Sequence, residues 1–214
     1  MNHVREQAEQ HQTLKEINWR IQQDLKAAAD AQRQLLPEIH RALGGIQIES
    51  AFVPSAVVSG DMYGCFALPN HKLGLYAVDV SGHGIHASLL SVAIGHLITP
   101  EYFNRVACHD GKQPDPANLV LRLNARFSQA DNDDYFTMFC AIIDTVTGHV
   151  DFCQAGYPAL TYVNPEGRGA LIGAGGFPVG MFSHFTYKNN SFTFEEGGTL
   201  VICSDAGIEA ENEN

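Results

Sequence analysis

Three aspartates in this chain stand beside small residues at the ends of apolar segments. Asp61 lies in VSGDMYG, Asp79 closes the apolar run KLGLYAVDVSG, and Asp205 follows the apolar run TLVIC. A rigid sheet that ends at all three positions would aim their side chains at a common point. Carboxylate oxygens are the ligands that Mg²⁺ and Mn²⁺ prefer. Each aspartate taken singly is more typical of a turn or a cap, and only the repetition of the pattern favours a divalent-metal site.

Ligands for a softer metal are missing near Asp79. His83 and His86 are three residues apart in a turn, and no third histidine is near them in the sequence. The five cysteines are scattered without a C-x-x-C pair, and several lie inside apolar runs. This distribution predicts buried free thiols in a reducing cytosol rather than zinc ligands or disulfides.

Composition excludes several classes of protein. The chain has 214 residues, of which 45% are hydrophobic, so it can form a packed core. Its net charge of −11 argues against a nucleic-acid binder, which would need a basic face. No apolar run reaches the length of a bilayer span, and no secretory signal opens the chain. We therefore expect a cytoplasmic protein with no nucleic-acid and no membrane partner.

Residues 5–42 are predicted to form one long helix, in which Pro37 is the only breaker. Polar and charged residues separate a narrow apolar stripe, which is typical of a helix that pairs with another helix. The stripe predicts a homodimer through this helix, and the alternative is that the helix packs on its own domain. The stripe consists of Leu14, Ile17, Ile21, Leu25, Ala28, Leu35 and Ile39.

Residues 44–214 have the pattern of an α+β domain, which we separate from a helical linker at 1–43. A helix is expected over 84–104, with one face formed by Leu89, Leu90, Ala93, Ile94 and Leu97. A second helix is expected over 115–130, capped by Asp115 and opened by Pro116. Strands are expected at 46–54 and 72–82, and strand follows strand from residue 136 onward, with a hairpin-like turn at 144–150.

Six segments, in this order, resemble the SpoIIE/RsbU-type bacterial serine/threonine phosphatases of the metal-dependent type 2C superfamily. They are LLP at 35–37, SGDMYGCFAL at 59–68, YAVDVSGHGIHASLL at 76–90, YFTMFCAIIDTVTGHVDFCQAGYPAL at 135–160, FPVGM at 177–181 and LVICSDAGIEAEN at 200–212. The DVSGHG block is the most specific of them. The resemblance implies a sandwich of two antiparallel sheets flanked by helices and preceded by the long N-terminal helix.

The resemblance also implies roles for the aspartates. Asp79 would bridge two Mn²⁺ or Mg²⁺ ions, the backbone carbonyl of Val80 would be a further ligand, and Asp205 would hold the second ion. Asp61 would lie beside the metals and act through bound water. Two such ions activate a shared water, which attacks phosphorus while the serine or threonine oxygen leaves. His83 has two interpretations: it protonates the leaving oxygen or positions water, or it is a turn residue hydrogen-bonded to the backbone.

The sequence departs from the family pattern at four positions. Ser59 stands where the family has a second glycine, Gly64 where it often has aspartate, Ala206 where it has the glycine of SDG, and Tyr157 where it has the histidine of AGHP. The family's late DD-x-T segment, which supplies another metal ligand, does not occur before Asn214. The resemblance thus implies a phosphatase domain that lacks its C-terminal end, or an impaired second metal site.

Three functions fit these features. The first is a metal-dependent phosphatase acting on a phosphorylated regulatory protein of the anti-sigma-factor-antagonist type, linked by its helix to an upstream sensor or receiver domain, as in a response regulator. The second is a catalytically weak, phosphatase-like adaptor that binds a partner protein. The third is a coiled-coil dimerisation module with an inert domain.

Overall fold

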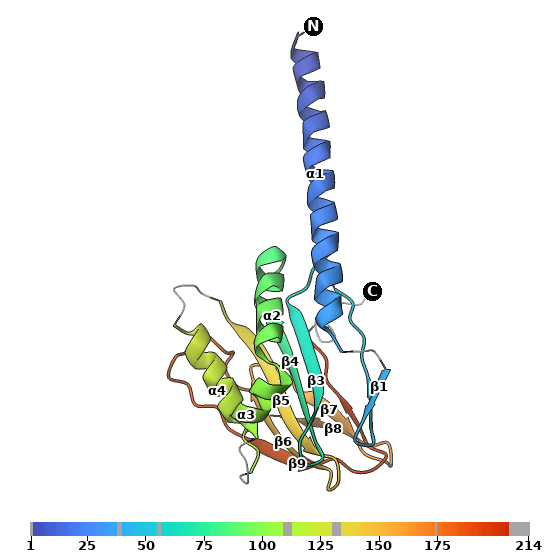
Figure 1. Ribbon diagram of the computed structural model, residues 1–214, viewed down its shortest axis with the longest axis vertical. Coiled ribbons are helices and arrows are strands. Elements are labelled where there is room, and N and C mark those ends of the chain that lie inside the picture. Colours follow the sequence, from blue (N-terminus) through green and yellow to red (C-terminus); the bar gives the residue numbers. More distant parts are fainter. Residues whose placement is uncertain are drawn as a thin grey trace.

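The computed structural model describes residues 2–37, 40–54, 57–108, 113–129, 134–173 and 175–205. They form an α+β sandwich from which one long helix projects (Figure 1). A five-stranded antiparallel sheet has the order β3-β4-β5-β6-β9, with strands Asp61–Leu68, Lys72–Val80, Phe136–Asp144, His149–Ala155 and Asn190–Thr193. A three-stranded antiparallel sheet has the order β10-β7-β8, with strands Thr199–Val201, Leu160–Val163 and Gly169–Ile172. These elements confirm the predicted α+β class.

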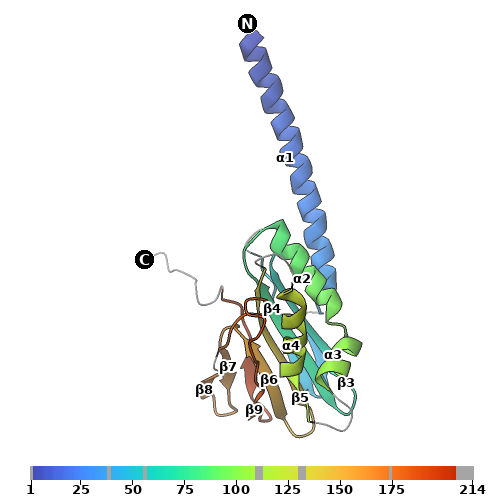
Figure 2. The same cartoon turned by 90° about the vertical axis from the view of Figure 1, so that its left-hand side faces the viewer.

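The larger sheet separates two hydrophobic cores. Helices α2 (Ile85–Leu97), α3 (Pro100–Ala107) and α4 (Pro116–Phe127) cover one of its faces, and the smaller sheet lies on the other (Figure 2). Because both faces are covered, β4 and β5 are almost continuously buried, as their unbroken apolar runs predict. The helix-side core includes Val78, Ile94, Leu119, Phe136 and Met138. The inner core, between the sheets, includes Leu73, Ala77, Phe139, Tyr157 and Leu160.

The predicted helix over 84–104 is two helices. Pro100 opens α3, and the Thr99 hydroxyl caps it by accepting a hydrogen bond from the backbone N–H of Tyr102 at 3.2 Å. The predicted apolar face is confirmed in part, because Ile94 is buried and Leu90 and Leu97 pack against the helix-side core, whereas Leu89 is 63% exposed. The buried residues of α2 are Ala87, Ser88, Ser91 and Ile94.

The second predicted helix is confirmed as α4. Asp115 precedes it, and its carboxylate accepts a hydrogen bond from the backbone N–H of Asn118 at 3.1 Å. The predicted turn at 144–150 is also confirmed, since β5 ends at Asp144 and β6 begins at His149.

The N-terminal helix α1 spans Asn2–Leu35 and ends before the predicted residue 42. Pro37 disfavours helical geometry in the residue before it, which explains the earlier end. Strand β1 (His40–Leu43) follows and pairs with β2 (Ile46–Glu49), so the expected domain boundary at 43/44 falls in the turn of this hairpin. Ile39 of the predicted stripe lies outside the described residues.

Among the α1 side chains that the structure describes, the buried ones lie in the C-terminal part of the helix. Ala29 and Gln32 are 6% and 2% exposed, whereas Leu14, Ile17 and Ile21 are 59%, 50% and 46% exposed. No described helix is long and apolar enough to cross a membrane.

The cysteines are free thiols, as predicted, but the predicted burial holds for three of the five. Cys65, Cys140 and Cys153 are buried, Cys108 is half-buried and Cys203 is exposed. Burial raises the pKa of the Cys140 thiol, and it raises the pKa of Cys153 to about 12.

Candidate active site

The pairing of β3 with β4 places Asp61 directly opposite Asp79. Alternate residues of a strand point to opposite faces of its sheet. Ala77 and Leu73, which are two and six residues before Asp79, belong to the inner core, so both aspartates lie on the face between the sheets, at one end of the sandwich. Asp61 is the first residue of β3, which corrects the expectation that it follows a strand.

The electrostatics of this pair favour a cation. Asp61 is partly buried, and burial is the largest cause of its raised pKa. The Ser59 hydroxyl, which donates to the Asp61 carboxylate at 2.9 Å, lowers the pKa, and the negative charge of Asp205 raises it. Two facing carboxylates with a third acid near them carry repulsive charge that a divalent cation would compensate. The donor set therefore fits a hard metal ion.

Asp205 reaches the same end of the sandwich from the smaller sheet. It follows β10 and its side chain is exposed. The pKa of the Tyr157 phenol is raised first by burial and then by the charges of Asp61, Asp79, Cys203 and Asp205. The charges of all three predicted aspartates therefore act on one side chain, that of Tyr157. Within the described ranges, however, no three His, Cys, Asp or Glu side chains are close enough to hold one ion together.

The carbonyl of Val80 lies close to Gly60. A Cβ atom on Gly60 would be 2.9 Å from the Val80 oxygen, so only glycine permits this approach. The N–H of Val80 also donates to the Gly60 carbonyl at 3.3 Å. The SGD segment and the strand end after Asp79 are therefore held together by their backbones.

His83 lies in the turn between β4 and α2 and is exposed. Gly82 and Gly84 on either side of it have φ angles of +87° and +85°, which glycine adopts without strain. In the part of the chain that the structure describes, the His83 ring has no hydrogen bond, which gives no support to its interpretation as a turn residue bonded to the backbone. Its role at the leaving oxygen stays a prediction. The neighbouring His86 instead contacts Asp134, with 2.7 Å between Nε2 and Oδ1.

A buried polar network links α1 to Asp61. The Gln32 side-chain amide donates to the Ser59 carbonyl at 2.7 Å and to the Ser91 hydroxyl of α2 at 3.0 Å, and the Ser59 N–H donates to Gln32 Oε1 at 3.2 Å. Ser59 also accepts a hydrogen bond from the Asp61 N–H at 3.1 Å. Ser59, which replaces the family's glycine, therefore makes two hydrogen bonds with Asp61. Gln32 connects α1 to this site through its hydrogen bonds with Ser59. Gln32 is polar and does not belong to the apolar stripe from which the role of this helix was predicted.

A second departure, Gly64, has a steric cause. A Cβ atom there would be 2.2 Å from the ring of Tyr76, which is its partner on β4. An aspartate at this position is incompatible with Tyr76 in its present place. Ala206, a third departure, lies outside the described residues.

Thr137 is a further polar residue at this end of the sandwich that was not among the predicted site residues. Thr137 pairs with Asp79 across β4 and β5, so its hydroxyl lies on the same face as both aspartates. It is the single hydroxyl side chain within the apolar strand FTMFCAIID, which is the signal that could have found it.

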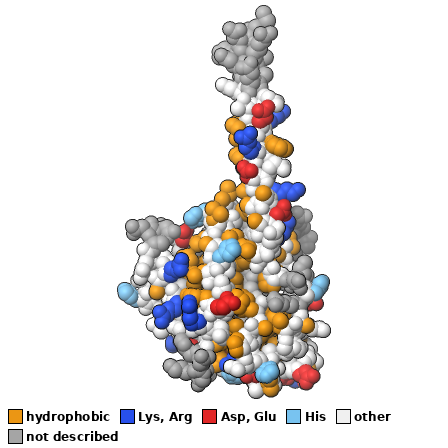
Figure 3. Space-filling model, in the orientation of Figure 1, with side chains coloured by type: hydrophobic (Ala, Val, Ile, Leu, Met, Phe, Trp, Pro, Cys, Tyr) orange, Lys and Arg blue, Asp and Glu red, His pale blue; other side chains and the backbone are white. Residues whose placement is uncertain are grey.

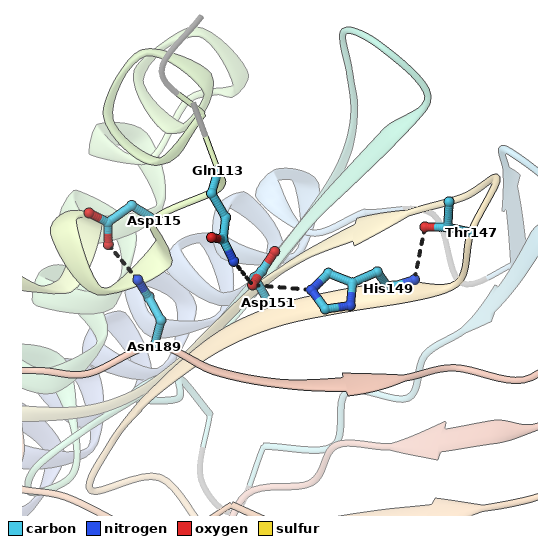
Figure 4. Close-up of polar contacts among 6 residues, drawn as sticks. All are labelled: Gln113, Asp115, Thr147, His149, Asp151 and Asn189. Atoms are coloured by element: carbon cyan, nitrogen blue, oxygen red, sulfur yellow. Dashed lines mark hydrogen bonds and ion pairs between the residues drawn. The ribbon is translucent and has the colours of Figure 1, made fainter. Parts of the chain in front are cut away.

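A second polar cluster lies toward the other end of the larger sheet, where the acids are already paired. The buried Asp151 carboxylate lies 3.4 Å from both Gln113 Nε2 and His149 Nε2, and Asn189 donates to Asp115 at 2.8 Å (Figure 4). A cavity of about 180 Å³ adjoins Asp151 and His149. These contacts give the buried Asp151 carboxylate polar partners and hold the segment before α4 against the sheet.

The chain belongs to the SpoIIE family. The family model, described as Stage II sporulation protein E, matches residues 69–214. Phosphoserine phosphatase RsbP of Bacillus subtilis (strain 168) is 26% identical over 169 residues, covering 77% of this chain and 40% of RsbP. Phosphoserine phosphatase RsbU of the same organism is 26% identical over 208 residues, covering 96% of this chain and 59% of RsbU. The chain therefore spans less than two thirds of either relative.

Solved structures show the same fold. The SiaA-PP2C domain of Pseudomonas aeruginosa superposes with a TM-score of 0.69 at 18% identity, covering 89% of this chain and 74% of that one. RsbX in complex with magnesium superposes with a TM-score of 0.52 at 19% identity, covering 68% and 65%. The expected type 2C phosphatase-like sandwich is thereby confirmed.

Proposed function

We propose that this chain is the catalytic part of a metal-dependent protein serine/threonine phosphatase. The observation that carries the proposal is the pairing of Asp61 with Asp79. The pair lies between the sheets at one end of a PP2C-type sandwich, in a member of the SpoIIE family. Two relatives named phosphoserine phosphatases support hydrolysis of phosphoserine or phosphothreonine.

In this proposal, Asp79, the Val80 carbonyl and Asp205 would hold two Mn²⁺ or Mg²⁺ ions, and Asp61 would act beside them through water. The magnesium in the RsbX structure supports a hard divalent ion. Bound ions of this kind lower the pKa of a coordinated water enough to supply hydroxide near neutral pH. Ser59 orients the Asp61 carboxylate through its hydroxyl. His83, which is exposed beside the strand end, protonates the leaving serine or threonine oxygen.

The substrate in this proposal is a small phosphorylated regulatory protein of the anti-sigma-factor-antagonist type in the cytoplasm. Residues 44–214 form the phosphatase domain in this proposal, and residues 1–43, whose helical part is α1, link it to an upstream sensor or receiver domain. The basis for these partners is the family resemblance together with the projecting helix.

The linker also forms a homodimer in this proposal. Figure 3 shows hydrophobic side chains exposed beside charged ones on the projecting part of α1. Leu14, Ile17 and Ile21 remain about half exposed, and each would contribute roughly 1.5–3 kcal/mol if fully buried by a second copy. Sedimentation of the wild type against the Ile17→Asp, Ile21→Asp double variant tests this, and a wild type that is monomeric at high micromolar concentration contradicts it.

The alternative is a phosphatase-like adaptor with weak or no activity. It is favoured by the exposed position of Asp205 and by the lack of a three-acid ligand group among the described residues. Release of inorganic phosphate from a phosphoserine protein, measured with Mn²⁺ and with EDTA, decides between the two. Mn²⁺-dependent release supports the phosphatase, and a folded protein without turnover supports the adaptor.

A further inference from the structure

Tyr157 occupies the position where the family resemblance places the histidine of AGHP. Its side chain is 5% exposed and belongs to the inner core between the two sheets. It comes from the turn after β6 rather than from either strand that carries Asp61 or Asp79. The proposed mechanism assigns it no role.

The backbone of this turn is fixed by several contacts. Gly156 has a φ of +71°, and a Cβ atom there would be 2.9 Å from Pro178 Cγ, so no larger residue fits. The buried Gln154 amide donates to the carbonyl of Tyr157 and, at 2.9 Å, to that of Pro158. Tyr157 is therefore held in one place before any ligand arrives.

The strand register brings the turn that carries Tyr157 to the acidic end of the sandwich. Gly156 forms a bridge with Met138, which is the neighbour of the Thr137 that faces Asp79. The charges of Asp61, Asp79 and Asp205 all act on the Tyr157 phenol and, after burial, raise its pKa. A tyrosine phenol is protonated at physiological pH at its ordinary pKa of about 10, so Tyr157 offers an O–H donor. Its oxygen has no hydrogen bond to any residue that the structure describes.

A phenol O–H donor at this acidic end of the sandwich suits an oxyanion ligand that arrives with cations. We propose that the Tyr157 hydroxyl donates a hydrogen bond to a phosphoryl oxygen bound at this end of the sandwich and so orients the phosphate. This inference rests on the proposed function, because it takes a metal-bound phosphoryl group as the ligand. Tyr157 is thus a substrate-positioning residue, and its hydroxyl does a task for which a histidine N–H would also serve.

The test compares Tyr157→Phe, which keeps the ring and removes the donor, with Tyr157→His, which restores an N–H donor. Tyr76→Phe is the matched control, because Tyr76 is a similarly buried tyrosine on the opposite face of the sheet. Calorimetry measures the affinity of each Mn²⁺-loaded protein for inorganic phosphate and its affinity for Mn²⁺. Steady-state phosphate release gives kcat/KM.

For Tyr157→Phe we expect phosphate affinity and kcat/KM to fall by about 10-fold or more, the range for a hydrogen bond to a charged group. Mn²⁺ affinity and melting temperature should stay at the wild-type values, Tyr157→His should recover part of the loss, and Tyr76→Phe should lose nothing. Unchanged phosphate affinity in Tyr157→Phe overturns the inference even if the wild type is an active phosphatase.

The two proposals fail separately. A wild type that binds phosphate more tightly than Tyr157→Phe but releases none from a phosphoprotein contradicts the phosphatase and supports the donor. A wild type that does not bind phosphate with Mn²⁺ overturns the donor. If Tyr157→Phe melts at a lower temperature than the wild type, the phosphate affinity of Tyr157→His decides whether the hydroxyl is a donor to phosphate. Recovered affinity supports the proposed hydrogen bond, and no recovery contradicts it.

Discussion

Carboxylates at the two ends of strands β3, β4 and β5 lie in opposite electrostatic environments. At one end, Asp61 lies directly opposite Asp79, and at the other, Asp144 lies directly opposite Lys72. Like charges that face each other destabilise a sheet, whereas opposite charges stabilise it by roughly 0.2–1 kcal/mol. One end of the same sheet therefore favours folding, and the other accepts unfavourable charge.

The acidities of the two ends show the same contrast. The pKa of Asp144 is lowered first by the backbone N–H of Thr147, with smaller contributions from the N–H of Val146 and from Lys72. The pKa of Asp61 is raised first by burial. Unfavourable electrostatics of this kind persist where a ligand compensates them, which is why we assign binding to the Asp61–Asp79 end.

The largest expected effect is on turnover. Asp79→Asn should lower Mn²⁺-dependent phosphate release by at least about 100-fold, because a neutral amide cannot hold and neutralise a divalent ion as a carboxylate does. Asp144→Asn is the matched control on the same sheet and should stay within about twofold of the wild type. Near-normal rates in Asp79→Asn would remove the functional difference between the two ends.

The next effect is stabilisation by metal. A cation that binds only the folded state at 100 times its dissociation constant adds about 2.7 kcal/mol to the free energy of unfolding. Thermal melts with and without Mn²⁺ should therefore show a rise for the wild type and for Asp144→Asn, and little or none for Asp79→Asn. An equal rise in Asp79→Asn would place the ion elsewhere.

Asp144→Asn should destabilise the protein at pH 7 by about 1 kcal/mol or less, since two turn hydrogen bonds at a largely exposed carboxylate are weakened. The folded-state pKa is below the ordinary value of 3.8, so this stability is present above that value and is lost as pH falls through the lowered pKa. Urea unfolding of both proteins at pH 7 and in steps below pH 3.8 should show the difference narrowing. If the difference in the free energy of unfolding between the two proteins does not vary with pH, it arises from packing and not from the Asp144 charge.

The smallest effect is at Asp61 and has the opposite sign. Because the folded-state pKa is raised, ionisation above pH 3.8 reduces the stability of the metal-free protein. Asp61→Asn should thus raise the free energy of unfolding in EDTA by roughly 0.5 kcal/mol at pH 7, after discounting for solvent screening. The gain should vanish below the ordinary pKa. A loss of stability at pH 7 would mean that the Ser59 hydrogen bond outweighs the burial.

Local signals were sufficient for some elements and insufficient for others. Strands β4 and β5 follow from long apolar runs, and α4 follows from the Asp115–Pro116 cap. Strand β3 was not predicted, because its middle residue Gly64 weakens the strand pattern and is explained only by the ring of Tyr76 across the sheet. Such a requirement arises from a partner in space and leaves no local trace.

The candidate site has the same limit. The small residues after Asp79 identify it as a site residue, but the sequence does not contain the register that places Asp61 opposite it. Thr137 and Tyr157 are farther away in the chain and become neighbours only through β5 and the turn after β6. Motifs therefore identify single residues, and pairing between strands determines the set.

The uneven burial of the cysteines makes the chain suitable for site-selective chemical labelling. Cys203 is exposed two residues before Asp205, whereas burial raises the pKa of the Cys140 and Cys153 thiols and suppresses their reactive thiolate form. A maleimide fluorophore added in limiting amount should therefore attach first at Cys203, without any engineered cysteine. The dye would stand near the group of acids, where its emission reports the arrival of a cation optically and in real time.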